Sequence, residues 1–309
     1  MVDLADMFGG GEGTRFLGLP AGDLQALEAD IVIFGADCAT PYRSVGAYCA
    51  GGPAAIRAGA AAYSGDLSKV NFDLLGPVLP ESVRAVDVGD LAVDPADSAG
   101  NRVAIAAATR QILAAGAVPV LLGGDDSLPI PLIEALGAGG EPLTILQIDA
   151  HIDWREMVEG EPLGLSSTMR RASEMAHVER IIQVGARGVG SAGMADLQAA
   201  RDWGVHLIPA HQFGDPQAVA DLIPEGARVA ICFDCDALDP AIMPAVIAPT
   251  AGGLSYAQVL GLIRAVAARG RIVSFDMVEF MAARDRDGAG ARTAAQLLTS
   301  VLGVIGGQR

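Results

Sequence analysis

The stretch that most constrains the fold is a largely apolar run, Leu143 to Ile148, that ends directly in three potential metal ligands. A run of this kind predicts a strand buried on both faces, as in a parallel sheet. Asp149, His151 and Asp153 follow at alternate positions, and alternate positions share a face while the backbone stays extended. We therefore expect these side chains to converge just beyond the strand, where open α/β sheets bind their ligands.

A second apolar run repeats this chemistry. Residues 229–233 lead into Asp234 and Asp236, which again lie two positions apart. Ionised carboxylates a few ångströms apart repel one another strongly. A pair of bound divalent cations would offset that repulsion, so we expect the two strand ends to share one metal centre.

Strand and helix patterns alternate along the chain from residue 30 onward. Helical segments, such as the alanine-rich stretch 98–115, separate most of the apolar runs. This alternation is typical of one mostly parallel sheet with helices on both faces, so we predict a single α/β domain over residues 1–309. The predicted strands, about eight in number, lie at residues 31–34, 83–88, 118–122, 143–148, 180–184, 205–208, 229–233 and 272–275.

The composition narrows the possible partners and locations. A formal net charge of −16 argues against nucleic acid or an anionic membrane as a partner. No apolar stretch is long enough to predict a transmembrane helix, and residues 1–22 lack the basic and apolar regions of a signal peptide. Four cysteines in a chain of this length do not indicate a disulfide framework. We expect a cytoplasmic protein that binds neither nucleic acid nor membrane.

Acidic groups follow four of the predicted strands, and one histidine accompanies them. Carboxylate-rich sites with a single imidazole suit hard or borderline ions such as Mn²⁺, whereas structural zinc prefers thiolate and imidazole. Any one of these aspartates could instead cap a helix, but the whole set favours a metal centre that lowers the pKa of a shared water. The four groups are Asp125 with Asp126, Asp149 with His151 and Asp153, Asp234 with Asp236, and Asp276 with Glu279.

Together these motifs resemble the ureohydrolase family, the arginases and agmatinases, and more closely its agmatinase-like branch. The resemblance covers roughly residues 30–300 and implies an arginase-like three-layer α/β/α sandwich. It also implies a binuclear manganese site, with Ni²⁺ or another divalent ion as an alternative, and a homo-oligomer, either trimer or hexamer. The matching segments, in the family's order, are Gly51–Arg57, Gly123–Ser127, Asp149–Asp153, Asp234–Pro240 with Gly252–Leu254, and Asp276–Glu279.

The resemblance further implies a reaction and a role for each site residue. Family members hydrolyse a C–N bond in a small cationic guanidino compound and release urea, by attack of a metal-bridging hydroxide on the guanidinium carbon. Asp153 would orient that hydroxide, and Asp125 would orient a ligand. Glu279 would pair with the guanidinium, because a carboxylate suits paired N–H donors. By the same carry-over, the metal ligands would be Asp126, Asp149, His151, Asp153, Asp234 and Asp236.

The sequence departs from the family at three places. Asp126 stands where the family usually has a histidine ligand, which leaves three outcomes open: an oxygen-rich site that binds both ions, altered metal preference or occupancy, or no site. Leu165 and Ser166 replace a His-Gly pair whose histidine is thought to shuttle protons, and neither is a general base near neutral pH. His177 is the one substitute considered. The loop Pro244–Pro249 lacks the usual glycines, which indicates a reshaped pocket and a substrate other than arginine.

Three functions remain open from the sequence. The main hypothesis is an amidinohydrolase acting on a linear amidine, agmatinase-like or guanidinobutyrase-like, because five of the six ligand types and Glu279 are retained. A non-catalytic or weakly active paralogue that serves as a subunit of an oligomer would explain the departures at Asp126 and Leu165. A hydrolase of a formimino or biguanide-like substrate is the third.

Overall fold

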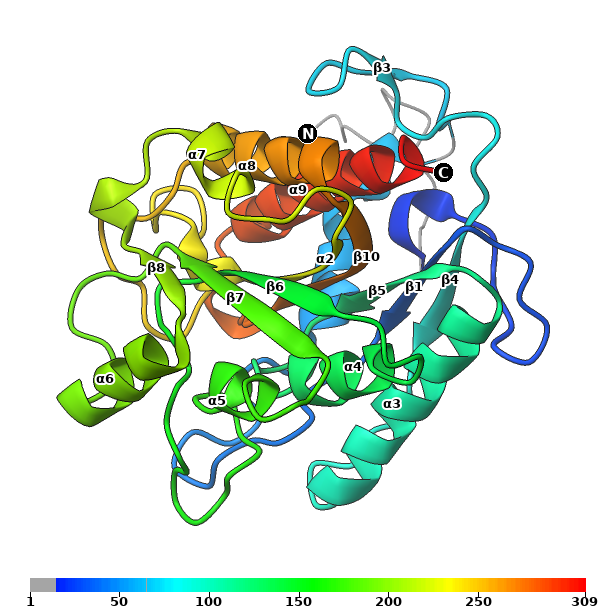
Figure 1. Ribbon diagram of the computed structural model, residues 1–309. Helices are drawn as coiled ribbons and strands as arrows, with labels where there is room; N and C mark the ends of the chain where they lie inside the picture. Colours follow the sequence, from blue (N-terminus) through cyan, green and yellow to red (C-terminus); the bar gives the residue numbers. More distant parts are fainter. Residues whose placement is uncertain (1–14, 65) are drawn as a thin grey trace.

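A computed structural model describes residues 15–64 and 66–309, and most of the segment 1–22, where we expect no signal peptide, lies outside them. One sheet of eight strands runs through the middle of the molecule (Figure 1), and all pairings between its strands are parallel. The predicted eight-stranded parallel sheet is therefore confirmed. Its strands are β1 Ile31–Gly35, β4 Ala85–Asp90, β5 Val118–Leu122, β6 Leu143–Ile148, β7 Val178–Val184, β8 His206–Ile208, β9 Arg228–Asp234 and β10 Arg271–Val278.

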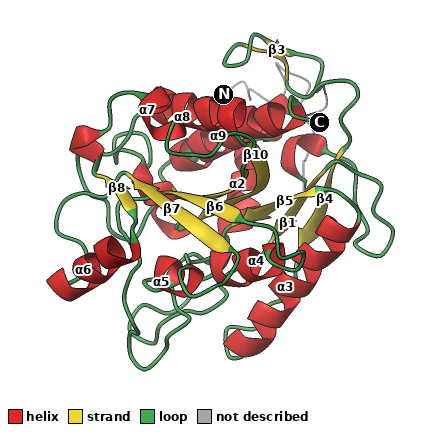
Figure 2. Cartoon of the chain, in the orientation of Figure 1, coloured by secondary structure: helices red, strands yellow, loops and turns green. Residues whose placement is uncertain are grey.

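Helices cover both faces of this sheet (Figure 2), which completes the three-layer arrangement expected from the sequence. Helices α2, α7, α8 and α9 pack together on one face, while α3, α4 and α5 pack on the other, with α6 beside them (Figure 1). The helix bounds are α2 Gly52–Gly59, α3 Ser98–Ala114, α4 Pro129–Leu136, α5 Thr168–Ala172, α6 Met194–Trp203, α7 Pro216–Ala220, α8 Tyr256–Arg269 and α9 Ala289–Gly306.

The apolar strands supply the core on both sides of the sheet. Every residue of β1, β5 and β6 is buried, as a parallel sheet between two helical layers requires. Successive side chains of β6 point to opposite faces: Leu146 and Ile148 join one hydrophobic cluster, and Leu143 and Ile145 join another. Both helical layers are thereby held by the same short strands.

The order of the strands, β4-β1-β5-β10-β9-β6-β7-β8, places the four acid-bearing strands side by side. Strand β10, the last in the chain, lies between β5 and β9, and β6 follows β9. Their ends are level, because Ile148 pairs with Phe233, Phe233 with Met277, and Met277 with Leu122. Acidic residues that are up to about 150 positions apart in sequence therefore leave the sheet at one edge.

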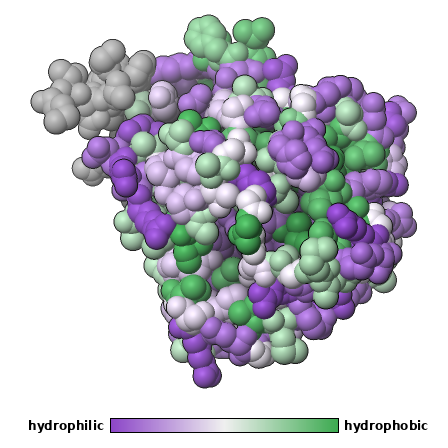
Figure 3. All heavy atoms as spheres, turned by 90° about the vertical axis from the view of Figure 1, so that its left-hand side faces the viewer, coloured by the Kyte–Doolittle hydropathy of each residue, from purple (hydrophilic) through white to green (hydrophobic). Residues whose placement is uncertain are grey.

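A short antiparallel hairpin, β2 Val70–Asn71 with β3 Gly76–Pro77, was not predicted. Two-residue strands show no recognisable periodicity. Phe72 and Leu75 in its turn are 81% and 84% exposed, and apolar side chains stand at the top of the molecule in Figure 3, where this hairpin projects. No helix within the described ranges has the length and apolar character needed to cross a membrane.

Helix α2 is tied to the sheet edge by a buried ion pair. Arg57, which is 3% exposed, donates from Nε to Asp87 Oδ2 at 2.8 Å and from Nη2 to Asp87 Oδ1 at 3.0 Å. Its Nη1 donates to Asp90 Oδ1 at 2.5 Å. At the other end of the helix, a Cβ on Gly52 would lie 3.0 Å from the carbonyl oxygen of Phe280, so the helix begins beside the residue that follows Glu279.

Arg57→Ala should therefore destabilise the protein strongly. The change leaves the fully buried Asp87 carboxylate without its cation, and breaking a buried pair in this way costs about 3–5 kcal/mol. The free energy of unfolding, measured by urea denaturation, tests the expectation. Arg84→Ala is the matched control, because its pair with Glu28 is exposed and should contribute less than about 1 kcal/mol. Equal losses in the two variants would contradict the structural role of Arg57.

Candidate metal centre

Two groups of three potential metal ligands lie at the carboxyl edge of the sheet, and they share one residue. Asp149, His151 and Asp236 form the first group, and Asp126, Asp149 and Asp153 form the second. Within each group, one donor atom from every residue lies within 4.8 Å of the others. The arrangement can hold two cations on either side of Asp149.

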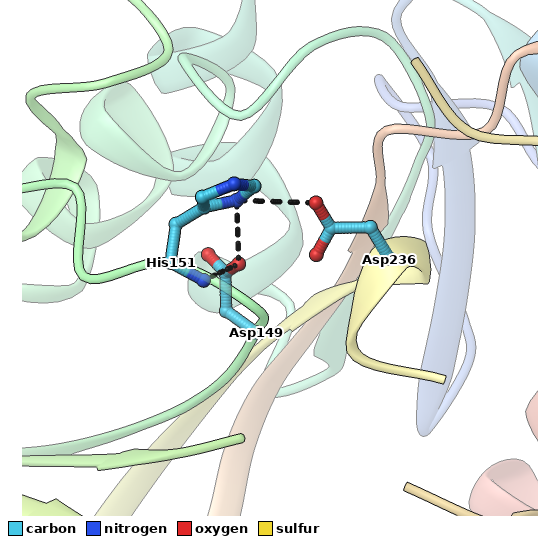
Figure 4. A group of neighbouring side chains, drawn as sticks. All are labelled: Asp149, His151 and Asp236. Carbon is cyan, nitrogen blue, oxygen red and sulfur yellow. Dashed lines mark hydrogen bonds and ion pairs between the residues drawn. The ribbon is translucent and has the colours of Figure 1, made fainter. Parts of the chain in front are cut away.

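His151 is the only imidazole in these two groups, and it lies against two carboxylates (Figure 4). Its Nδ1 is 3.1 Å from Asp236 Oδ2 and 3.4 Å from Asp149 Oδ1. Burial opposes protonation of the ring, but the hydrogen bonds to Asp149 and Asp236 and their charges raise the pKa of His151 to about 12. Positive charge is thus strongly favoured at this point, whether a proton or a cation supplies it.

The second group consists of carboxylates alone. Asp126, Asp149 and Asp153 are all buried, and within the described part of the chain Asp126 Oδ2 has no hydrogen-bond partner. Burial, followed by the charges of neighbouring carboxylates, raises the pKa of Asp126 and of Asp153 well above the ordinary value. Burial also opposes ionisation of Asp149, yet hydrogen bonding to His151 and Asp153 lowers its pKa to about 2. A buried, unpaired oxygen among like charges is a position that a cation would stabilise.

Special backbone conformations bring these residues together. The chain leaves the extended conformation after Ile148, and Asp153 adopts a positive φ of 44°. The convergence of Asp149, His151 and Asp153 is therefore produced by a loop, and not by the extended geometry from which it was expected. Gly124 has a φ of 71°, and a Cβ there would lie 2.7 Å from the amide nitrogen of Cys38, so the turn before Asp126 needs glycine.

Asp234 and Asp236 approach the same site from β9 and the short 3-10 helix η4, Cys235–Ala237. Asp234 Oδ1 accepts the Asp236 amide at 2.7 Å, and Asp236 Oδ1 accepts the Ala150 amide at 3.0 Å. Asp236 belongs to the first ligand group, whereas Asp234 belongs to neither. Burial, together with the charges of Asp236 and Asp149, still raises the pKa of Asp234 well above its ordinary value, so its carboxylate lies close to the others.

Gln147 organises the carboxylates and was not identified from the sequence. Its Nε2 donates to Asp149 Oδ2 at 2.7 Å and to Asp153 Oδ2 at 2.5 Å. Its own Oε1 accepts a hydrogen bond from Gln183 Nε2. Gln183 lies on the neighbouring strand β7 and is paired in register with Gln147. An amide side chain inside an otherwise apolar strand, two positions before Asp149, was the available signal.

Glu279 lies beside Asp126 and is held by a tyrosine that the sequence did not reveal. Glu279 Oε1 accepts the Tyr48 hydroxyl at 2.5 Å and the Asp126 amide at 2.9 Å. Burial, with the charge of Asp125, raises the pKa of Glu279 to about 8, against the lowering effect of the Tyr48 hydrogen bond. Burial and the Glu279 charge raise the pKa of Tyr48 well above its ordinary range, so Tyr48 remains a hydrogen-bond donor.

The positions where a proton-shuttling histidine was expected contain no replacement base. Leu165 packs against the buried cluster of Cys38, Tyr48 and Cys49, and the Ser166 amide donates to the hydroxyl of Tyr42. The proposed substitute, His177, was a wrong choice. It lies at the amino end of β6, with its Nε2 2.9 Å from the Ile133 carbonyl oxygen. One strand length of six residues, about 20 Å, separates that end from the metal ligands.

Comparison with known proteins agrees with this fold. The chain is 31% identical to chicken mitochondrial agmatinase over 235 residues, which cover 74% of this chain and 68% of that protein. It is 31% identical to proclavaminate amidinohydrolase of Streptomyces clavuligerus over 299 residues, covering 93% and 91%. The crystal structure of the Streptomyces protein superposes with a TM-score of 0.82 at 26% identity, covering 97% of this chain and 99% of that one.

A parallel α/β/α sandwich with clustered carboxylates at the ends of its central strands defines a class of metal-dependent hydrolases. The model of the arginase family matches residues 29–303, so this chain belongs to the arginase family. Members of that family depend on a binuclear metal centre, and the two groups of ligands around Asp149 fit such a centre.

Removing one of the crowded carboxylates should stabilise the protein when divalent ions are absent. Asp126→Asn replaces a buried acid that is repelled by Asp149 with a neutral amide that can donate to it. In the presence of EDTA we expect a higher melting temperature than in the wild type, and a smaller increase on adding Mn²⁺. Glu225→Gln, a change of an 86% exposed side chain, should alter neither value. A lower melting temperature for Asp126→Asn in EDTA would contradict the repulsion.

Proposed function

We propose that this chain is a metal-dependent amidinohydrolase acting on a linear amidine, and that it cleaves a C–N bond of a small cationic guanidino compound and releases urea. The observation that supports this most directly is the pair of three-ligand groups sharing Asp149, with Glu279 beside them. The two relatives described above carry the names agmatinase and amidinohydrolase, which describe the same type of reaction.

The donor set suits two divalent ions, and we propose Mn²⁺, with Ni²⁺ as the alternative. Asp126, Asp149 and Asp153 would hold one ion, and Asp149, His151 and Asp236 the other, with Asp234 completing the set. The buried Asp126 Oδ2, which has no hydrogen-bond partner among the described residues, supports this assignment. When bound, the ions would supply positive charge and a water of lowered pKa.

Glu279 is proposed to bind and orient the guanidinium group. Its Oε1 already accepts two hydrogen bonds, from Tyr48 and from the Asp126 amide. Its Oε2 is therefore the oxygen that can accept a guanidinium N–H. Tyr48 would act as a positioning residue, because it fixes the rotation of the carboxylate that meets the substrate. The charge-assisted bond would hold the planar guanidinium next to the metal ligands.

Asp153 is proposed to orient the attacking water. Its Oδ2 is fixed by Gln147 Nε2 at 2.5 Å, and the carboxylate stands next to Asp126 and Asp149. Leu165 cannot exchange protons, and we assign the catalytic roles to Asp153 and Glu279. We further propose a cytoplasmic, single-domain protein that assembles as a homo-oligomer, either trimer or hexamer.

A second candidate function is a non-catalytic or weakly active subunit of an oligomer. Two observations favour it: Asp126 adds a negative charge to the ligand set, and Leu165 is packed into an apolar cluster. Copurification with a second arginase-family chain, and activity that appears only in that complex, would support this candidate over the enzyme.

The proposal predicts release of urea by the purified, Mn²⁺-loaded protein from at least one small guanidino compound. A screen over agmatine, guanidinobutyrate, guanidinopropionate, arginine, guanidine and N-alkylguanidines tests it. Asp149→Asn should lower urea release by more than about 100-fold, because both metal groups lose their shared ligand. Asp202→Asn, on the exposed surface of α6, should leave it unchanged. No urea from any compound at full metal loading would overturn the proposal.

Asp126→His should increase activity with Mn²⁺ several-fold. The candidate ligands contain five aspartates, so their formal charge of −5 against two divalent ions, +4, leaves −1. Exchanging Asp126 for a neutral imidazole brings the sum to zero, which strengthens the metals as Lewis acids and lowers the pKa of bound water. Asp126→Asn is the control, since it removes the same charge without an imidazole ligand. Equal or lower activity in Asp126→His would mean that the site is adapted to aspartate.

A further inference from the structure

A cavity of about 540 Å³ opens beside His151. The His151 side chain is 24% exposed, whereas the Asp149 and Asp236 side chains of the same ligand group are 2% and 4% exposed. The loop from Gly188 to Met194 covers this side, and a Cβ on Gly190 would lie 3.2 Å from His151 Cδ2. The cavity therefore gives access from solvent to His151 of the first ligand group.

Most of the walls of this cavity are apolar or small, and the polar residues in its lining are His151, Arg187, Ser191 and the exposed His211. None of its lining residues is an aspartate or a glutamate, so the cavity offers no counter-charge to an ammonium group. The larger apolar residues in its lining are Ile152, Met194, Leu197, Leu207 and Pro209. An alkyl chain would exchange water for apolar contact there, at about 0.8 kcal/mol per buried methylene.

Arg187, the one arginine in the lining, does not provide a site for a carboxylate. Its Nε donates to the Thr250 carbonyl at 3.0 Å, and its Nη2 donates to the carbonyls of Asp236 and Leu238 at 2.7 and 3.2 Å. Its Nη1 donates to the carbonyls of Ala237 and Gly185. The guanidinium is thus engaged with backbone oxygens, and the carboxylates of the metal centre would repel a further anion.

The surroundings of Glu279 include an apolar cluster as well. Tyr48, whose hydroxyl bonds to Glu279, packs with Cys38 and Cys49. Leu165, Ile247, Met281 and Ala47 pack against that cluster.

Building on the proposed function, we infer that the guanidino substrate bears an uncharged, apolar substituent that lies in the cavity beside His151. The substrate class is an N-alkylguanidine. Its only charge is then the guanidinium, which Glu279 compensates. An amine-bearing tail would lose hydration in this cavity without gaining an acidic partner, and the carboxylates of the metal centre would repel a carboxylate-bearing tail.

The experiment compares N-butylguanidine with agmatine and 4-guanidinobutyrate. Agmatine has the same four-carbon chain with a terminal ammonium group, and 4-guanidinobutyrate has a chain of similar length that ends in a carboxylate. Urea release by the Mn²⁺-loaded protein gives kcat/KM for each compound, and calorimetric titration gives the Kd without relying on turnover. We expect kcat/KM for N-butylguanidine to exceed that of both charged compounds by at least about tenfold, with Kd in the same order.

A variant pair tests the location of the substituent. Ser191 lines the cavity and its side chain is exposed, so Ser191→Asp adds a carboxylate to the wall. We expect the ratio of kcat/KM for agmatine to that for N-butylguanidine to rise at least about fivefold in Ser191→Asp. Ser191→Asn, which has the same shape without the charge, should keep the wild-type ratio.

The outcomes separate this inference from the proposed function. Urea release with a preference for agmatine or 4-guanidinobutyrate would overturn the inference and leave the amidinohydrolase in place. A preference for N-butylguanidine that Ser191→Asp does not change would overturn the cavity as the binding site of the substituent. No urea from any compound would overturn the proposed function and, with it, this inference.

Discussion

The crowding of buried carboxylates at the centre of a parallel sheet is the constraint on which the rest of the structure depends. Like charges in a poorly solvated interior repel one another, as the raised pKa values of Asp126, Asp153 and Asp234 reflect. Hydrogen bonds from Gln147 and the charge of His151 offset only part of this repulsion. A metal centre would offset the rest. Without metal, the repulsion destabilises the fold at the carboxyl edge of the sheet, and the packing of the apolar layers must compensate for it.

The rigidity of the sheet makes such an arrangement possible. Four adjacent strands with level ends place the acids within a few ångströms of one another, and both faces of those strands are locked by packed helices. Loops complete the geometry: Asp153 and Glu279 adopt positive φ values that non-glycine residues rarely take. Strained residues of this kind persist where the surrounding packing holds the backbone in place. Here the two strained residues, Asp153 and Glu279, are candidate catalytic groups.

Much of the site could be anticipated from local motifs, but the residues that orient it could not. Residue type and spacing can be recognised in the sequence, and they identify Asp149, His151, Asp153 and Asp236 as candidate ligands. Tyr48 contacts Glu279 from 231 positions away, and no short-range pattern records such a contact. His177 illustrates the opposite error. It is close to the site in sequence, but it lies at the amino end of β6, opposite to the end that carries the metal ligands.

The sequence by itself determined the strands of the central sheet, the helices between them, the chemical type of the ligands and the departures at Asp126 and Leu165. These follow from local periodicity, turn chemistry and side-chain identity. Only the tertiary structure decided that β10 lies between β5 and β9, that Asp149 is shared by two ligand groups, and that the cavity beside His151 lacks acidic groups. Strand pairing and cavity walls depend on contacts between distant segments, and the free energy of those contacts is set by the packing of the whole chain.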